Sequence, residues 1–89
     1  MKFKQIVPKA GLLNRILPFG DERFPLLGWI DEYSNTIFNA IQMGPLLKEL
    51  DQLEGTISTE EGRELLAQIR EMAIECRNAP QTYLRFMGD

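Results

Sequence analysis

The sequence contains no histidine and only one cysteine, and these two scarcities exclude much catalytic and metal chemistry. Without histidine the chain cannot form Ser-His or Cys-His nucleophile pairs, and it lacks both the usual neutral-pH base and the commonest zinc ligand. Cys76 alone can form neither an intramolecular disulfide nor a cysteine-rich metal site, so nothing indicates an oxidising compartment. We therefore expect a cytoplasmic protein that uses no cofactor.

Long hydrophobic runs and glycine-rich phosphate-binding motifs are also missing. The longest apolar stretches, such as residues 26–30, are far shorter than the roughly 20 residues that span a bilayer. The 10 Lys and Arg residues against 13 Asp and Glu give a net charge of -3, which provides no general attraction to nucleic acid or anionic lipid. We expect neither a nucleic-acid partner nor a membrane partner.

The composition is that of an ordinary small folded domain. The chain has 89 residues, of which 44% are hydrophobic and 26% are charged, close to globular averages. This length supports one hydrophobic core near the lower size limit for folding without metals or disulfides. We expect residues 1–89 to form a single domain.

Alternating and β-rich segments predict about four mostly antiparallel strands. Residues 2–7 alternate loosely, and residues 27–33 and 36–38 are rich in aromatic and β-branched side chains on either side of a Ser-Asn pair. Because Asn tolerates positive φ, that pair predicts a tight hairpin. Residues 82–87 alternate again, and this last strand is expected to pair beside the first strand or inside the sheet.

Two helices are predicted over residues 45–54 and 59–77. The first helix is predicted to begin at Pro45, because a residue in the first helical turn does not need the backbone N–H that proline lacks. The start of the second helix is indicated by Ser58 and Glu61, which are three residues apart as in a capping box. The second helix has one apolar stripe: Leu65, Leu66, Ile69, Met72, Ala73 and Cys76. Because two helices can cover only one face of the sheet, the sequence predicts an α+β fold with one open sheet face.

The predicted hairpin leaves open which of its faces is covered. Trp29, Tyr33 and Phe38 would share one face, and Ile30 and Ile37 would share the other. If the isoleucines pack under the helices, the aromatic side chains form an exposed interaction surface. If the aromatic side chains form the core instead, the open face is an ordinary solvated surface.

The segment over residues 8–25 is the second candidate surface. It is rich in proline and glycine yet also apolar, so we expect a long, partly packed loop. Connections of this length are uncommon in compact domains and are often functional, although it could simply close one end of the sheet. The candidate contact residues in this loop are Arg15, Phe19, Asp21, Glu22 and Arg23.

These patterns favour a small non-enzymatic protein–protein interaction module. The partner would be another protein or a second copy of the chain, bound through the 8–25 loop or the open sheet face, where Trp29, Tyr33 and Phe38 are candidate contacts. Toxin-neutralising immunity proteins, adaptor subunits and regulators belong to this class.

The alternative is a carboxylate-dependent or metal-dependent enzyme, or a small-molecule-binding domain. Asp21, Glu22, Asp31 and Tyr33 would then be the residues to test. Their spacing is not diagnostic, because adjacent residues such as Asp31 and Glu32 point to opposite faces of a strand.

Overall fold

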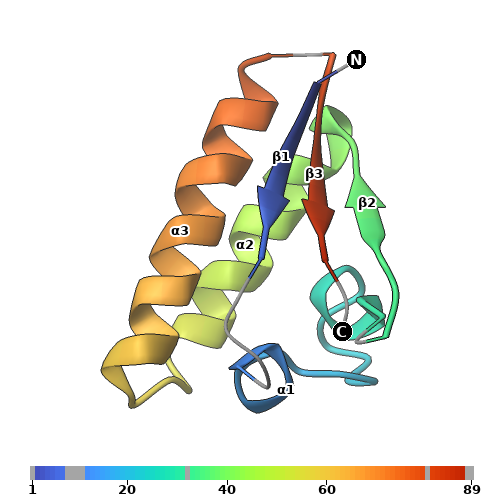
Figure 1. Cartoon of the computed structure of the whole chain (residues 1–89). Coiled ribbons are helices and arrows are strands. Elements are labelled where there is room, and N and C mark those ends of the chain that lie inside the picture. Colours follow the sequence, from blue (N-terminus) through green and yellow to red (C-terminus); the bar gives the residue numbers. More distant parts are fainter. Residues whose placement is uncertain (1, 8–11, 32, 80, 88–89) are drawn as a thin grey trace.

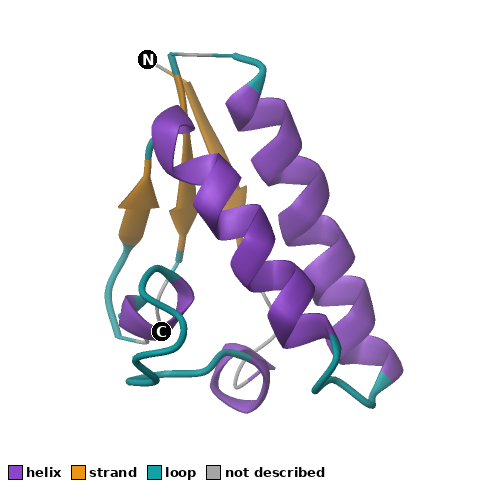
Figure 2. Ribbon diagram, turned by 180° about the vertical axis from the view of Figure 1, so that it is seen from behind, coloured by secondary structure: helices purple, strands orange, loops and turns teal. Residues whose placement is uncertain are grey.

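The computed structural model describes residues 2–7, 12–31, 33–79 and 81–87. Two long helices cover one face of a three-stranded sheet (Figures 1 and 2). The other face of the sheet is turned toward the viewer in Figure 1 and has no helix over it. The elements in chain order are β1 (Lys2–Ile6), α1 (Leu12–Ile16), the 3-10 turn η1 (Leu27–Trp29), β2 (Thr36–Phe38), the 3-10 turn η2 (Ala40–Gln42), α2 (Met43–Glu54), α3 (Glu60–Arg77) and β3 (Thr82–Phe86).

The last strand, β3, lies in the middle of the sheet. It runs parallel to β1, with Phe3 opposite Tyr83, and antiparallel to β2, with Ile37 opposite Arg85. The prediction that the last strand pairs beside the first is confirmed. The prediction of about four mostly antiparallel strands is corrected to three strands in the described residues, with one parallel and one antiparallel pair.

The fourth strand is missing because the predicted hairpin over residues 27–33 and 36–38 does not form. Residues 27–29 form η1, and β2 pairs with β3 instead. The N–H of Asp31 donates to the Thr36 hydroxyl at 2.9 Å, while the Asp31 carboxylate accepts from the N–H of Tyr33 at 2.8 Å. Side chains thus take backbone donors that a hairpin ladder would need, which is how Asp and Thr compete with regular structure.

Neither predicted division of the hairpin faces is correct. Ile30 and Phe38 are both buried, whereas Trp29 and Ile37 are both exposed. Phe38 packs edge-to-face against Phe86, with ring centroids 5.8 Å apart. Phe38, a candidate contact residue in the sequence, therefore belongs to the core and offers no open surface.

The two long helices match their predicted bounds to within two residues. The apolar stripe of α3 is buried as predicted, with Met72 partly buried at its edge. The N-terminal cap of α3 is Thr59 rather than Ser58, since the Thr59 hydroxyl accepts the N–H of Gly62 at 3.1 Å. No helix in the described part of the chain has the length and apolar character needed to cross a membrane.

The described part of the 8–25 segment packs against one end of the sheet. Its N-terminal portion forms α1, and Leu12, Ile16, Leu17 and Phe24 are buried in the core. Residues 8–11 lie outside the described ranges. Figure 1 places α1 and the following residues beyond the ends at which β1 and β3 finish.

Candidate functional site

A buried carboxylate on α2 fixes the chain that follows α1. Glu49 is only 5% exposed, and its Oε1 accepts the N–H groups of Leu26 and Leu27 at 3.0 and 2.9 Å. The first N–H groups of a helical turn have no partner within the turn, so a carboxylate is a suitable acceptor for them. Hydrogen bonds to a charged acceptor are roughly twice as strong as neutral ones. Glu49 therefore ties residues 17–31, here called the anchored segment, to α2.

Two glycines allow the backbone of the anchored segment to fold closely against itself. Gly20 has a φ of +75°, which side-chain-bearing residues rarely adopt, and its N–H donates to the carbonyl oxygen of Gly28 at 2.7 Å. A Cβ added at Gly28 would lie 2.5 Å from the carbonyl oxygen of Asp21. The two backbone stretches thus approach more closely than any side chain at residue 28 would permit.

The anchored segment and the residues just after it form a shallow hollow with large exposed aromatic side chains. Trp29 is 70% exposed and Tyr33 is 75% exposed. The hollow has a volume of ≈ 400 Å³, and we call it the aromatic hollow; it is lined by Phe19, Gly20, Gly28, Trp29, Ile30, Asp31 and Tyr33. An apolar ring surface of this kind, held on an ordered backbone, is suited to contact with another molecule.

Asp31 gives the aromatic hollow a negative charge. Its two carboxylate oxygens accept hydrogen bonds from the N–H of Tyr33 at 2.8 Å and from the Ser34 hydroxyl at 2.7 Å. These bonds, the backbone one foremost, hold the pKa of Asp31 below its ordinary value, so the group is ionised at neutral pH. The hollow therefore combines aromatic faces with one carboxylate.

The neighbouring turn is neutralised within itself. The Asp21 carboxylate pairs with the Arg23 guanidinium at 2.7 Å and also accepts the N–H of Arg23 at 2.9 Å. The side-chain bond, followed by the backbone bond, lowers the pKa of Asp21. Glu22, between them, is exposed. These three charged residues thus lie in one turn beside the aromatic hollow, without lining it.

The structure brings together only part of the predicted contact set. Phe19, Trp29 and Tyr33, which come from different predicted elements, share the aromatic hollow. Arg15 lies elsewhere, and Phe38 is in the core. Glu49 is absent from the predicted contact set, although its position in the sequence indicates that its carboxylate is buried.

That indication is the place of Glu49 on the apolar stripe of α2. Glu49 lies three residues after Leu46 and four before Leu53, and both leucines are buried. Residues at these spacings share one face of a helix. An acidic residue on such a face requires a buried donor, here the backbone of Leu26 and Leu27.

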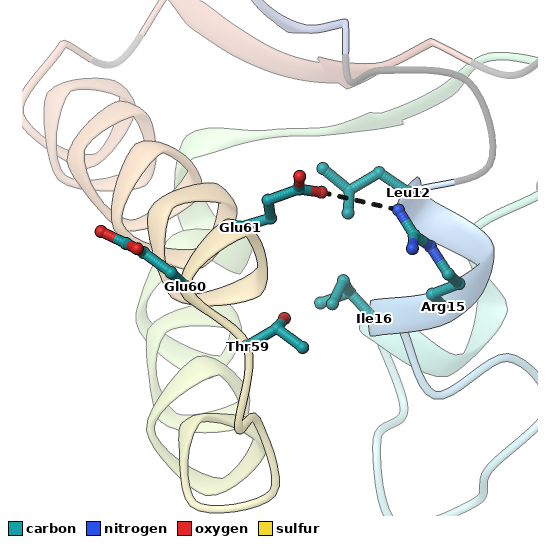
Figure 3. A pocket seen from close by; sticks show the side chains of 6 residues that line it. All are labelled: Leu12, Arg15, Ile16, Thr59, Glu60 and Glu61. Carbon is teal, nitrogen blue, oxygen red and sulfur yellow. Dashed lines mark ion pairs between the residues drawn. The ribbon is translucent and has the colours of Figure 1, made fainter.

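A second surface lies between α1 and the N-terminus of α3 (Figure 3). Arg15 and Glu61 form an ion pair of 3.6 Å across it, and both side chains are more than half exposed. Exposed pairs of this kind contribute little stability, typically about 0–1 kcal/mol. The groove is lined by Leu12, Arg15, Ile16, Thr59, Glu60 and Glu61, and its two glutamates disfavour an anionic ligand. The groove is thus a contact between α1 and the start of α3 with one weak, exposed ion pair across it.

The open sheet face is a third surface, and its arginine, Arg85, already contacts neighbouring side chains of the sheet. The Arg85 guanidinium lies 4.6 Å from the ring centroid of Phe3 and donates to the side-chain oxygen of Gln5. The Phe3 ring also packs against Tyr83, with centroids 5.6 Å apart. The Nε of Arg85 is buried without an acceptor among the described residues, so an incoming ligand cannot reach it. These contacts tie the sheet side chains to each other.

No metal-binding cluster is assembled in the described part of the chain. No three acidic or cysteine side chains converge there. Cys76 is a free, buried thiol, and loss of solvent around it raises its pKa, so the unreactive protonated form is favoured. The strongest chemical feature is therefore the aromatic hollow.

No protein-family model matches the sequence, and no curated protein or solved structure matches it either. The aromatic hollow combines aromatic residues, a carboxylate and an anchored backbone.

Proposed function

We propose that this protein is a small non-enzymatic binding module that docks another protein through the aromatic hollow. The observation that carries the proposal is the 70% exposure of Trp29 on a backbone held in place by the buried Glu49 carboxylate. Tryptophan and tyrosine are enriched among the residues that dominate binding energy at protein interfaces. Trp29 is the anchor residue of the proposed interface, and Tyr33 lies beside it in the hollow.

Burial of Trp29 supplies a favourable term for association. A tryptophan side chain buries about 150–250 Å² when it is fully covered, and each Å² contributes about 25 cal/mol before the costs of association. Most of the Trp29 surface is still available for this gain. A partner that covers Trp29 thus gains several kcal/mol from one side chain.

The anchored segment lowers the cost of binding. Ordering a mobile loop on association consumes free energy that then no longer appears as affinity. Here the Glu49 bonds, the Gly20–Gly28 contact and the Asp21–Arg23 pair order the backbone in the unbound chain. The proposed surface is therefore preorganised, as tight interfaces require.

The other two surfaces favour docking less. On the open sheet face, the Arg85 guanidinium already contacts Phe3 and Gln5. The α1–α3 groove contains an exposed ion pair.

The proposed binding uses no disulfide, since Cys76 is buried, and it suits the reducing conditions of the cytoplasm.

The proposal is tested by affinity capture from native lysate with three tagged chains: wild type, Trp29→Ala and Ile41→Ala. Ile41 is a matched control because it is 86% exposed, lies in η2 and is not among the residues that line the hollow. We expect wild type and Ile41→Ala to retain a stoichiometric partner that Trp29→Ala loses. Equal capture by all three chains would refute the hollow as the docking site.

Light scattering of the purified chains separates a foreign partner from a second copy. If the wild type is a dimer and Trp29→Ala is a monomer, the partner is the chain itself. Circular dichroism and thermal unfolding of each variant establish that the fold is retained, which we expect because both substituted side chains are exposed.

A further inference from the structure

We infer that the aromatic hollow receives an arginine side chain of the protein partner. This inference rests on the proposed function and specifies the chemistry of the partner surface. The carrying observation is that aromatic residues and the acidic Asp31 line one hollow and that Trp29, Tyr33 and Asp31 are all exposed. A cation is attracted to the face of an aromatic ring, most strongly to tryptophan, and also to a carboxylate.

Arginine fits this combination better than the other side chains. Its planar guanidinium stacks on aromatic faces and donates two parallel hydrogen bonds to a carboxylate. Among the described residues, Asp31 Oδ1 accepts the N–H of Tyr33 and Oδ2 accepts the Ser34 hydroxyl, and a carboxylate oxygen has a second acceptor position. Asp31 is exposed and is thus able to accept these further bonds.

The charges around the hollow favour a basic partner. The chain has a net charge of -3, and the cation of the adjacent turn, Arg23, is paired with Asp21 at 2.7 Å. Within the described residues the Asp31 carboxylate forms no ion pair, and its hydrogen-bond donors, the N–H of Tyr33 and the Ser34 hydroxyl, are neutral. A partner arginine would supply the positive charge that this carboxylate lacks.

The dimensions of the hollow suit one long side chain. Its volume is ≈ 400 Å³ and it is open to solvent, so a guanidinium from another molecule can approach Trp29 and Tyr33. Gly20 and Gly28 line the hollow without side chains of their own, and each is required by the backbone at its position. The space where a Gly20 Cβ would stand is open, so no side chain at this residue narrows the hollow, whereas the space beside Gly28 is filled by the carbonyl oxygens of Asp21 and Pro18.

Trp29 makes this inference directly measurable because it is the only tryptophan in the chain. We would titrate the purified protein with an acetylated, amidated tetra-arginine peptide at constant ionic strength and follow tryptophan fluorescence. Tetra-lysine and tetramethylammonium chloride serve as comparison probes. We expect a saturable change with the arginine peptide, at least about threefold tighter than with the lysine peptide because of ring stacking and paired hydrogen bonds.

Substitution of Asp31 distinguishes a site from general attraction to an acidic protein. Asp31→Asn should weaken arginine-peptide binding by at least about fivefold, as expected for loss of a charge-assisted contact. Glu64→Gln removes the same charge from an exposed position on α3 that does not line the hollow, and it should leave binding within about twofold, as expected of a solvent-screened charge. Tyr33→Ala is a second variant that should weaken binding while retaining the charge. Thermal unfolding of each variant checks that the fold persists.

Three results would overturn the arginine inference. One is the absence of a saturable change, and another is an equal effect of Asp31→Asn and Glu64→Gln. The third is tighter binding of tetramethylammonium than of the arginine peptide, which would indicate a small cationic ligand in place of a protein side chain.

Peptide binding tests the arginine inference, and capture of a partner tests the proposed function, so the two can be rejected independently. If the arginine peptide does not bind while Trp29→Ala still abolishes capture, the hollow docks a protein by other contacts and only the arginine inference falls. If Trp29→Ala also leaves capture unchanged, the proposed function falls with it.

Discussion

The carboxylate of Glu49 accepts the backbone N–H of Leu27 at 2.9 Å, joining α2 to the first residue of η1. Both partners are buried, so the bond lies in a region of low dielectric where it is strong if made and costly if broken. Trp29 follows Leu27 by two residues and closes the same turn. The position of the exposed tryptophan thus depends on a carboxylate in the helical layer.

Replacing Glu49 by glutamine should destabilise the fold by about 1–3 kcal/mol, because an amide group would then face the N–H groups that the carboxylate oxygens accept. Urea unfolding measures this loss. Glu64→Gln, at an exposed position on α3, is the matched control and should change stability by less than about 0.5 kcal/mol. Equal stability of the two variants would show that the anchoring bond contributes nothing.

Alanine at residue 28 should be much less tolerable than alanine at residue 44. A Cβ at Gly28 meets the carbonyl oxygens of Asp21 and Pro18 at 2.5 and 3.2 Å, whereas one at Gly44 meets nothing within 4 Å. We expect Gly28→Ala to lose about 1–3 kcal/mol and Gly44→Ala, in the first turn of α2, to be neutral or slightly stabilising. Thermal unfolding of the two variants measures this difference. Equal unfolding midpoints for Gly28→Ala and Gly44→Ala would contradict the close packing at Gly28.

The cap of α3 is also open to test. Thr59→Ala removes the acceptor of the Gly62 N–H and should reduce the free energy of unfolding by about 1 kcal/mol. Ser58→Ala, one residue earlier, should have almost no effect. If Ser58→Ala were the costlier change, the helix would begin with the capping box that the sequence pattern predicted.

The acidic titration of Asp21 should depend on Arg23. The Arg23 side chain and N–H lower the folded-state pKa of Asp21 below its ordinary 3.8, so the pair stabilises the fold at higher pH and this stabilisation is lost as the pH falls through the lowered pKa. In Arg23→Gln the carboxyl should titrate closer to 3.8, while the titration of Asp31, set by Tyr33 and Ser34, should not move. Carbon-detected NMR follows both groups, and an unchanged Asp21 midpoint would contradict the pairing.

Much of the helical layer could be predicted from the sequence because its signals are local. Pro45 indicated the start of the first helix, and the apolar stripe through Ile69 and Cys76 indicated the buried side of the second. The position of the last strand beside the first also followed from its apolar alternation. For the two helices, residues a few positions apart decide the structure, whereas the strand pairing joins Lys2–Ile6 to Thr82–Phe86 across the length of the chain.

The aromatic hollow could not be predicted because long-range contacts override local preference there. The β-rich residues around Trp29 favour a strand, yet Glu49, more than 20 residues later, takes the N–H groups of Leu26 and Leu27. The Asp31 carboxylate then binds Tyr33 and Ser34 and prevents a tight hairpin. Phe19, Trp29 and Tyr33 were each candidate contacts, but only the folded chain places them around one hollow.

The central claim, that a partner covers Trp29, is tested most directly by fluorine NMR of the chain labelled with 5-fluorotryptophan. The label gives one resonance because the sequence has one tryptophan. Addition of the protein captured from lysate should shift or broaden this resonance in a saturable manner, and Tyr33→Ala should weaken the effect. If the captured protein co-migrates with the chain on size exclusion while the resonance stays at its free position, the interface lies elsewhere and the claim is wrong.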